Sequence, residues 1–313
     1  MRRLNRISAA ACAARWGVSE RTVRNYCAKG RIPGAVLEGK TWHIPEDAER
    51  PERVNKRSDL PRTLPERLRM EKSMQLRGGI YHKVQIDMTY NSNHIEGSRL
   101  THEQTRLIFE TLTIGMEDGP VYVDDVVETA NHFRCIDLVI ENANRPLSEA
   151  FIKELHRTLK NGTSDSRQSW FAVGEYKKLA NEVGGQATTA PGKVKAAMAR
   201  LIQEYNCKPA KTLDDLLDFH VAFERIHPFQ DGNGRVGRLI LFKECLRCGI
   251  VPFIIDDRHK MFYYRGLKEW PKTPGYLRDT CLLMQDDFKA ALDYFGIEYG
   301  TDAEPQTEVS DDE

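Results

Sequence analysis

The sequence predicts a mainly α-helical protein, in which a helical domain with one short β-hairpin follows a smaller module. Apolar residues beyond residue 60 recur with the spacing of amphipathic helices, as in Asn233–Cys248, which is followed by a glycine. Glu182–Thr189, which contains a Gly-Gly pair, has the pattern of a small hairpin. The other expected helices are Thr101–Thr113, Val123–Asn144, Ser148–Leu159, Pro191–Glu204 and Thr212–Ile226.

Proline and charge patterns divide the chain. Four prolines lie in a charged stretch that is poor in apolar residues and is typical of a linker: Pro45, Pro51, Pro61 and Pro65. We therefore expect a module over residues 1–55, a linker and lead-in helix over 56–74, the helical domain over 75–295, and an acidic, disordered tail over 296–313.

The net charge of zero conceals an uneven distribution. Residues 1–60 hold 13 Lys and Arg against 7 Asp and Glu, a net charge of +6, and the rest of the chain therefore holds −6. A basic end on an acidic body favours nucleic acid as a partner of the first module. No apolar run is long enough to span a membrane, and the alanine-rich stretch at Ile7–Ala14 stops at Arg15, unlike a signal peptide. The odd number of seven cysteines indicates free thiols and a cytoplasmic location.

The first 50 residues follow the pattern of two short helices and a two-stranded wing. Ser8 is positioned to cap a first helix that Gly17 ends, and Ser19 is positioned to cap a second helix. Ala35–Leu37 and Lys40–Ile44 are expected to pair as the wing. The module is therefore expected to be a small winged helix-turn-helix domain.

Basic side chains lie on the outer face of the second expected helix. Arg21, Arg24 and Lys29 occupy positions from which a recognition helix contacts DNA phosphates and bases. This segment resembles, by pattern, the winged helix-turn-helix modules of MerR-like regulators and phage excisionases. The resemblance implies DNA binding by residues 1–55, and a module for protein contacts is the alternative.

The stretch HPFQDGNGRVGR, which begins at residue 227, combines the residue types of a phosphate-transfer site. Gly232, Asn233 and Gly234 open the long helix, so its free N–H groups and the positive end of its dipole form an anion site. Arg235 and Arg238 lie three residues apart on one face of the first turn, and their forked donors suit phosphate oxygens.

Other side chains of the same stretch complete the expected chemistry. Asp231 supplies a hard oxygen ligand for Mg²⁺, which binds through carboxylates together with substrate phosphates. His227 titrates near neutrality at the entrance of the loop, where a general base belongs, and Phe229 is expected to turn inward. Together these residues predict phosphoryl or nucleotidyl transfer.

The stretch matches every defined position in the signature of the Fic family, H-P-F-x-[D/E]-G-N-G-R-x-x-R. The resemblance implies a protein adenylyltransferase that moves AMP from ATP to a hydroxyl group of an unknown target protein, or of itself, and releases pyrophosphate. It implies that His227 deprotonates the hydroxyl and that Asp231 holds Mg²⁺. It also implies that Asn233 and the flanking glycines hold the phosphates, Arg235 the β-phosphate and Arg238 the γ-phosphate.

The resemblance extends around this stretch, from about residue 75 to residue 290. The hairpin at Glu182–Thr189 corresponds to the family's flap, which docks a segment of the target protein by strand addition. Tyr263 and Tyr264 match the region where an aromatic side chain of the family lines the adenine pocket, and packing in the core is the alternative for both. The resemblance also implies a homodimer.

A second pattern fits the inhibitory motif of the family, [S/T]-x-x-x-E-[G/N]. It consists of Ser92, Glu96 and Gly97 and lies upstream of the signature, as in class II members. The resemblance implies that Glu96 pairs bidentately with Arg238 and so removes this arginine from the γ-phosphate. The chain departs from the family in one respect, because Ser98 follows Gly97 where Asn is frequent.

The residues leave other functions open. The same fold supports removal of AMP from a target, with the inhibitory glutamate positioning a water molecule, or transfer of UMP or GMP. A different class of hypothesis is a DNA-binding transcriptional regulator in which the helical domain senses nucleotide. The intact signature favours AMP transfer, because relatives that transfer phosphocholine or phosphate usually have altered positions in this stretch.

Overall fold

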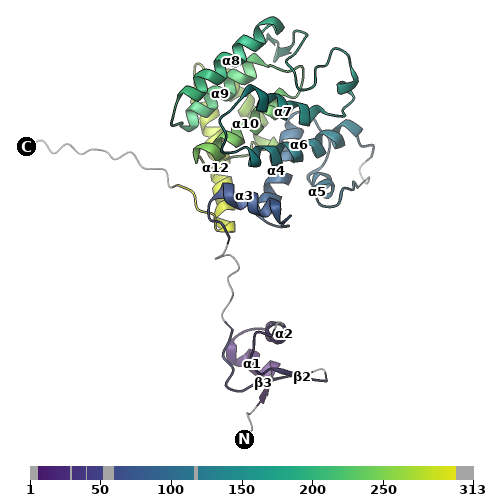
Figure 1. The fold of residues 1–313 in the computed structure, drawn as a ribbon, viewed down its shortest axis with the longest axis vertical. Helices are drawn as coiled ribbons and strands as arrows, with labels where there is room; N and C mark the ends of the chain where they lie inside the picture. The colour runs from purple at the N-terminus through teal and green to yellow at the C-terminus, as the bar shows by residue number, and fades with distance from the viewer. Residues whose placement is uncertain (1–5, 29, 40, 52–59, 116–118, 301–313) are drawn as a thin grey trace, which may run out of the picture. The chain divides into compact units, whose positions relative to one another are not determined.

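The computed structural model describes residues 6–28, 30–39, 41–51, 60–115 and 119–300 (Figure 1). The chain forms two compact units, Met1–Asp59 and Leu60–Glu313. Helices dominate the described residues, so the expected mainly α-helical class is confirmed. None of the described helices is long and apolar enough to cross a membrane.

The first unit packs two helices against a small antiparallel sheet. Its described elements are β1 (Arg6–Ser8), α1 (Ala9–Trp16), α2 (Glu20–Ala28), β2 (Val36–Glu38) and β3 (Thr41–Pro45). The strand order is β1-β3-β2, and β1 is a strand that the sequence pattern does not predict. Ser8 caps α1 by accepting a hydrogen bond from Ala11 N–H at 3.2 Å, and Gly17 ends that helix, both as expected.

The second unit is a helical domain with one short hairpin. Its described elements are α3 (Leu64–Ser73), α4 (Ile80–Ile95), α5 (His102–Thr111), α6 (Val123–Glu141), α7 (Glu149–Lys160), the 3₁₀ turn η1 (Asp165–Arg167), β4 (Glu182–Val183), β5 (Gln186–Ala187), α8 (Pro191–Cys207), α9 (Leu213–Ile226), α10 (Asn233–Cys248), the 3₁₀ turn η2 (Asp257–His259), α11 (Lys260–Glu269) and α12 (Gly275–Phe295). The hairpin β4–β5 falls where the sequence predicts it.

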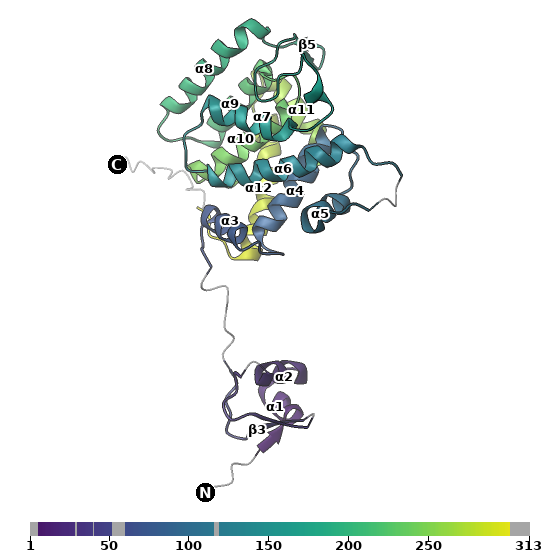
Figure 2. The same cartoon turned by 45° about the vertical axis from the view of Figure 1, so that its right-hand side comes forward.

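Helix α10 lies in the middle of the second unit in both views (Figures 1 and 2). It packs against α4, α6, α7 and α9, and its residues from Val236 to Leu246 are buried. A helix that is buried on every face is a core helix. The burial includes Arg235 and Arg238, so the start of α10 brings two cations into the interior.

The bounds of the observed helices agree closely with the expected ones, and α10 has the expected bounds, Asn233–Cys248. Helix α4 is not among the helices that the pattern singles out. It buries polar residues such as Gln85, Thr89 and Asn93 together with its apolar ones, so its inner face lacks a clear apolar period.

The first residues of the tail expected from residue 296 belong to the folded second unit. Ile297 is buried in the core, and the N–H of Glu298 donates to the carbonyl of Arg62 at 2.8 Å. The remainder of the expected tail, residues 301–313, lies outside the described residues.

Leu239→Ala on α10 is expected to lower the free energy of unfolding of the second unit by roughly 2–5 kcal/mol, because this side chain is 0% exposed. Leu283→Ala on α12 is the matched control, since its side chain is 49% exposed, and it is expected to cost less than about 1 kcal/mol. Denaturant unfolding followed by far-ultraviolet circular dichroism measures both losses. Equal losses would contradict the burial of α10.

Candidate active site

The segment from His227 to Gly232, here called the motif loop, joins α9 to α10. His227 has a φ of +50° and ends α9, with its N–H donating to Phe223 O at 2.9 Å. Gly232 has a φ of +77° immediately before α10, a conformation that glycine adopts without the cost of a Cβ. The first N–H groups of α10 have no carbonyl partner earlier in the same helix, so they remain available to an anion.

The side chain of Asn233 fastens the motif loop to its own backbone. Its Oδ1 accepts a hydrogen bond from Phe229 N–H at 2.8 Å, and its Nδ2 donates to Phe229 O at 2.9 Å. Asn233 is buried, so both functions of the amide are used within the loop. The side chain therefore holds the shape of the loop, and the expected contact of Asn233 with phosphates stays a prediction that its backbone N–H at the start of α10 can serve.

Phe229 turns inward, as the sequence predicts, and stacks on a histidine of α7. The ring centroids of Phe229 and His156 are 4.0 Å apart, with an interplanar angle of 3°. Nδ1 of His156 accepts from Gly174 N–H at 2.9 Å, which places the ring proton on Nε2, 3.2 Å from Asp231 O. Burial lowers the pKa of His156 to about 3. A neutral imidazole therefore supports the motif loop on its inner side.

Four charged side chains, two basic and two acidic, meet at the first turn of α10. Lys160 Nζ lies 2.6 Å from Asp231 Oδ2 and 2.5 Å from Glu128 Oε1. Arg235 pairs with Glu128 through Nη1, and its Nη2 lies 3.3 Å from Asp231 Oδ2. Lys160 and Arg235 are both buried, so the cluster balances its own charge within the core.

Glu128 and Lys160 are site residues that sequence reasoning missed. They come from α6 and α7, far from the motif loop in sequence. Lys160 offers one signal, because it lies on the inner face of α7, whose other buried residues are apolar apart from His156. A lysine at such a position is rarely buried unless it is paired.

Asp231 is ionised within this cluster. Burial opposes its charge, but Arg235 and Lys160 outweigh burial and lower the pKa of Asp231 to about 2. Its Oδ2 makes the contacts with both cations, and its side chain is 48% exposed. A backbone hydrogen bond from Gly232 to the carboxylate acts in the same direction on the pKa of Asp231.

These features fit Mg²⁺, which binds through one or two carboxylates together with substrate phosphates. The described residues contain no group of three or more His, Cys, Asp or Glu side chains that could hold a metal ion by themselves. The fit therefore depends on Asp231 together with the phosphates of a substrate.

The imidazole of His227 is oriented by the end of α9. Its Nδ1 lies 3.3 Å from Glu224 O, and because a carbonyl only accepts, Nδ1 carries the proton and Nε2 is the acceptor. Burial lowers the pKa of His227 against the opposing effect of the Glu224 carbonyl. Lys177 lowers it further, while Glu96 and Asp231 act in the opposite direction. His227 is therefore neutral at pH 7 and able to act as a base.

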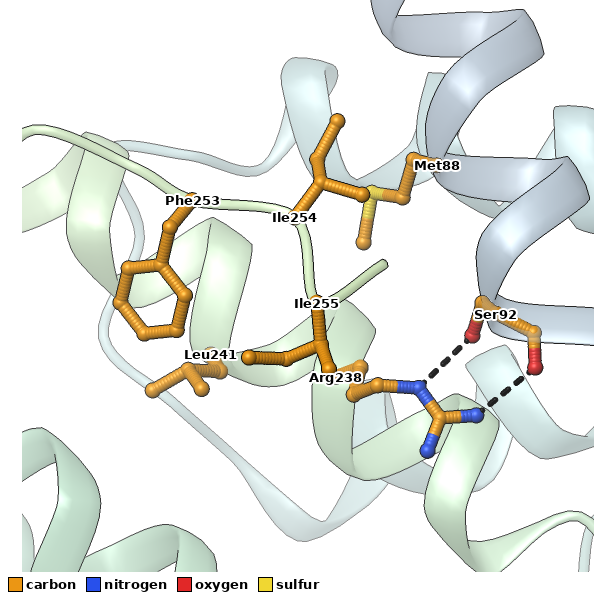
Figure 3. Close-up of a pocket in the computed structure, with 7 residues that line it drawn as sticks. All are labelled: Met88, Ser92, Arg238, Leu241, Phe253, Ile254 and Ile255. Carbon is orange, nitrogen blue, oxygen red and sulfur yellow. Dashed lines mark hydrogen bonds between the residues drawn. The ribbon is translucent and has the colours of Figure 1, made fainter. Parts of the chain in front are cut away.

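Arg238 is bound by the end of α4 (Figure 3). Its Nε donates to Ser92 Oγ and its Nη2 to Ser92 O, both at 2.9 Å. Nη2 also lies 2.8 Å from Glu96 Oε1. The expected contact between Glu96 and Arg238 is present with one hydrogen bond in place of two, because Ser92 occupies Nε. Apolar side chains line a small pocket beside this guanidinium: Met88, Leu241, Phe253, Ile254 and Ile255.

The Glu96 carboxylate lies against the N-terminus of α10. A Cβ at position 234 would be only 2.3 Å from Glu96 Oε1, so the absence of a side chain at Gly234 leaves room for this carboxylate. Gly97 follows, and its N–H donates to His94 O at 3.1 Å. A carboxylate at a helix N-terminus, with a guanidinium beside it, occupies the kind of position that suits a phosphate.

The two tyrosines expected at the adenine pocket differ in position. Tyr263 is 1% exposed, and its hydroxyl lies 2.6 Å from His220 Nε2, so it packs in the core, as the alternative interpretation states. Tyr264 is 39% exposed, and its hydroxyl donates to Ile95 O at 3.4 Å, next to Glu96. Tyr264 therefore lies at the edge of the site.

Two of the basic residues expected to contact DNA are exposed on α2 of the first unit. These are Arg21 and Arg24, and the second pairs with Glu20 one turn earlier in the helix. Lys29 lies outside the described residues.

The second unit is thus a helical domain in which the motif loop leads directly into the N-terminus of a buried helix. Residues 146–244, which include the motif loop, match the Fic/DOC family. The chain therefore contains a Fic/DOC domain.

Curated relatives share part of this chain. The protein adenylyltransferase Fic of Drosophila melanogaster is 30% identical over 215 residues, which cover 66% of this chain and 41% of that protein. The protein of the same name from Drosophila yakuba is 31% identical over the same shares of the two chains. This chain thus spans 41% of the length of each relative.

Solved structures share the fold. A Fic domain containing signaling protein from Bacteroides thetaiotaomicron is 26% identical, with a TM-score of 0.55 over 74% of this chain and 91% of that one. Fic-1 from C. elegans is 19% identical, with a TM-score of 0.58 over 72% of this chain and 69% of that one, and supports the fold alone.

Because of Glu224 on α9, the free energy of unfolding is expected to fall as the pH rises through neutrality. Its Oε1 is buried without a hydrogen-bond partner. Burial, opposed by Arg238 and reinforced by Glu96, raises the pKa of Glu224 to about 8. In the unfolded chain the pKa of this carboxyl group is about 4.3. The protonated group therefore contributes fully to the free energy of unfolding below that pH, and this contribution is lost as the pH rises towards 8.

Glu224→Gln removes this titration. Its melting temperature should therefore rise relative to wild type between about pH 5 and about pH 8, which calorimetry measures. Glu154→Gln, at an exposed position on α7, is the control and should follow the wild-type curve. A difference between Glu224→Gln and wild type that does not change with pH would count against a protonated buried carboxyl group.

Proposed function

We propose that this chain is a protein adenylyltransferase, which moves AMP from ATP to a hydroxyl group of a protein. The observation that carries the proposal is the neutral His227, with Nε2 as acceptor, at the entrance of an anion site. That site combines the N-terminus of α10 with Arg235 and Arg238. The names of the Drosophila relatives support the same reaction.

The proposed step is a displacement at phosphorus. The target hydroxyl oxygen attacks the α-phosphorus of ATP while His227 Nε2 takes the hydroxyl proton. The bond from the α-phosphorus to the bridging oxygen breaks, and pyrophosphate leaves. The first turn of α10 and its arginines neutralise the phosphate charge.

Asp231 is the residue that would hold Mg²⁺. Lys160 and Arg235 contact Oδ2 and fix the orientation of the carboxylate that would hold the metal. When bound, Mg²⁺ supplies charge neutralisation at the phosphates.

The exposed hairpin β4–β5 is the proposed docking site for the target segment. Both of its strands are two exposed residues long, and an extended segment binds to such an edge through main-chain hydrogen bonds. The target is another protein or a second copy of this chain. On the resemblance alone we also propose a homodimer, and a cytoplasmic location fits the free thiols.

We extend the proposal to inhibition by Glu96. Its carboxylate bonds to Arg238 and lies against Gly234, so this guanidinium is engaged before a nucleotide arrives. A carboxylate and a phosphate at the same place repel each other. Removal of Glu96 would free Arg238 for the γ-phosphate and so align the α-phosphate with His227.

Incubation with ATP and Mg²⁺ is expected to add AMP to the Glu96→Gly variant at least about tenfold faster than to wild type. The reason is that a hydrogen bond between charged groups is worth about 1.5–3 kcal/mol. Glu96→Gly combined with His227→Ala should show no addition, because the base is missing. Intact-protein mass spectrometry measures the mass of one AMP group, and incubations with UTP and GTP distinguish the other nucleotide transfers.

Addition to the double variant at the rate of Glu96→Gly would exclude His227 as the base. A wild-type rate equal to that of Glu96→Gly would exclude inhibition by Glu96. Removal of AMP is distinguished by a second incubation with an AMP-modified protein: wild type would then release AMP from it, and Glu96→Gly would accumulate no new adduct in the first incubation.

DNA binding by the first unit is the second proposed function. The observation that favours it is an exposed Arg21 on α2 in a segment with a net charge of +6 over residues 1–60. This function is compatible with transfer by the second unit. DNA binding is also what the alternative hypothesis requires, in which the chain is a transcriptional regulator that senses nucleotide through its Fic/DOC domain.

Arg21→Ala is expected to weaken binding to a duplex of mixed sequence and to reduce the slope of log affinity against log salt by about 1, because one phosphate contact is lost. Fluorescence anisotropy over a range of salt concentrations measures this slope. Arg200→Ala, at an exposed position on α8, is the control and should leave the slope unchanged. Equal slopes for Arg21→Ala and wild type would remove α2 from the DNA contact.

A further inference from the structure

Lys177 is a buried cation without an acidic partner among the described residues. The residue is 3% exposed, and burial lowers the pKa of its ammonium group to about 8. An uncompensated charge inside a protein is costly, so buried lysines are usually paired. Lys160, the buried lysine of the charge cluster, has Glu128 and Asp231 for that purpose. The unpaired state of Lys177 therefore needs a different explanation.

The ammonium group of Lys177 closes the base of the flap, defined here as residues 181–188 with β4 and β5 between its ends. Nζ donates to Asn181 Oδ1 at 2.7 Å and to Thr188 Oγ1 at 2.6 Å. These two residues also bond to each other, with Thr188 Oγ1 donating to Asn181 O at 3.0 Å. One cation therefore binds both ends of the flap.

The same residue binds the chain on both sides of His227. Nζ of Lys177 donates to Ile226 O at 3.3 Å, and the backbone N–H of Lys177 donates to Pro228 O at 2.9 Å. Ile226 and Pro228 are the residues immediately before and after His227 in the sequence. Lys177 thus connects the flap directly to the backbone that carries the imidazole.

The other described contacts between this segment and the motif loop are neutral. Asn181 Nδ2 donates to Phe229 O at 3.1 Å, and Leu179 N–H donates to Gln230 Oε1 at 3.2 Å. The strands of the flap are short and exposed, and an isolated hairpin is at best marginally stable in water. The position of the flap relative to His227 therefore depends on these hydrogen bonds, and Lys177 supplies the charge among them.

Charged groups from several elements act on His227. Asp231 acts from the motif loop and Glu96 from the end of α4, and both favour the protonated imidazole. Lys177, from the segment before the flap, acts against protonation. Glu224, one turn earlier on α9, contributes its carbonyl to Nδ1.

We propose that Lys177 is a positioning residue for the transfer step. Its ammonium group fixes the flap opposite His227, and with the flap the target hydroxyl group that the flap presents. Its unpaired positive charge keeps the imidazole of His227 in the basic form. The inference rests on the proposed function, which makes His227 the base. The role also explains why the hydrogen-bond partners of Nζ are uncharged hydroxyl and carbonyl oxygens. A carboxylate beside Nζ would cancel the electric field of the lysine at His227.

The first test measures His227 itself and does not require transfer activity. Full-length protein with ¹³C- and ¹⁵N-labelled histidine is titrated by NMR between about pH 5 and pH 9, and His227→Asn identifies the resonance. Lys177→Gln keeps a hydrogen-bond donor without the charge, and Lys177→Arg keeps the charge. Lys178→Gln, at the exposed neighbouring position, is the matched control, and thermal unfolding shows that each variant is folded.

Loss of the cation should raise the pKa of His227 in Lys177→Gln, because a nearby positive charge disfavours the protonated imidazole. The pKa should stay at the wild-type value in Lys177→Arg and Lys178→Gln. An unchanged pKa in Lys177→Gln would overturn the inference. Equal shifts in Lys177→Gln and Lys177→Arg would overturn it as well, because they would show that packing and not charge is responsible.

The second test measures AMP addition in a Glu96→Gly background. Lys177→Gln should lower the maximal rate at pH 7 at least about tenfold and move the acid limb of the pH profile to higher pH, while KM for ATP stays unchanged. A changed KM for ATP at an unchanged maximal rate would place Lys177 in nucleotide binding and contradict the inference. Absence of transfer in Glu96→Gly alone would count against the proposed function, and the NMR titration would still decide the role of Lys177.

Discussion

The structure of the site depends on the burial of two guanidinium groups at the start of α10. An arginine side chain stays charged in a protein, so Arg235 and Arg238 need anions or carbonyl groups inside the core. Helix α6 and the motif loop provide the carboxylates for Arg235, and the end of α4 provides the acceptors for Arg238. Elements far apart in sequence therefore converge on one end of α10, where the carboxylate of Glu96 lies against Gly234 and Arg238.

Much of the helical domain could be predicted because its signals are local. The glycines at 232 and 249 set the ends of α10, and an apolar period marks α7 and α9. The residues of the motif loop could be identified for the same reason, since their chemistry follows from close spacing. The contact of Glu96 with Arg238 joins residues that are 142 positions apart, and family resemblance indicated it where local physical chemistry could not.

The remaining site residues depend on packing that a sequence pattern does not reveal. Lys160 lies in an amphipathic helix and Lys177, next to Lys178, in a polar segment, and a lysine in such a segment is normally exposed. The burial of Lys177 becomes visible only when the segment before the flap is packed against the motif loop, whereas the position of Lys160 beside Leu155 and Leu159 offers one signal in the sequence. Tyr263 and Tyr264 illustrate the same limit, because the sequence leaves core packing and the adenine pocket open for both, and only packing shows that Tyr263 is buried against His220.

The amide of Asn233 has a consequence for the thermodynamics of ligand binding. Because both of its functions bond to Phe229, and that ring stacks on His156, the motif loop is ordered by its own side chains. The conformational entropy of the loop is lost when the domain folds and not when a ligand binds. Association with an anion at this loop therefore carries a smaller entropic penalty than association with a loop that has to be ordered first.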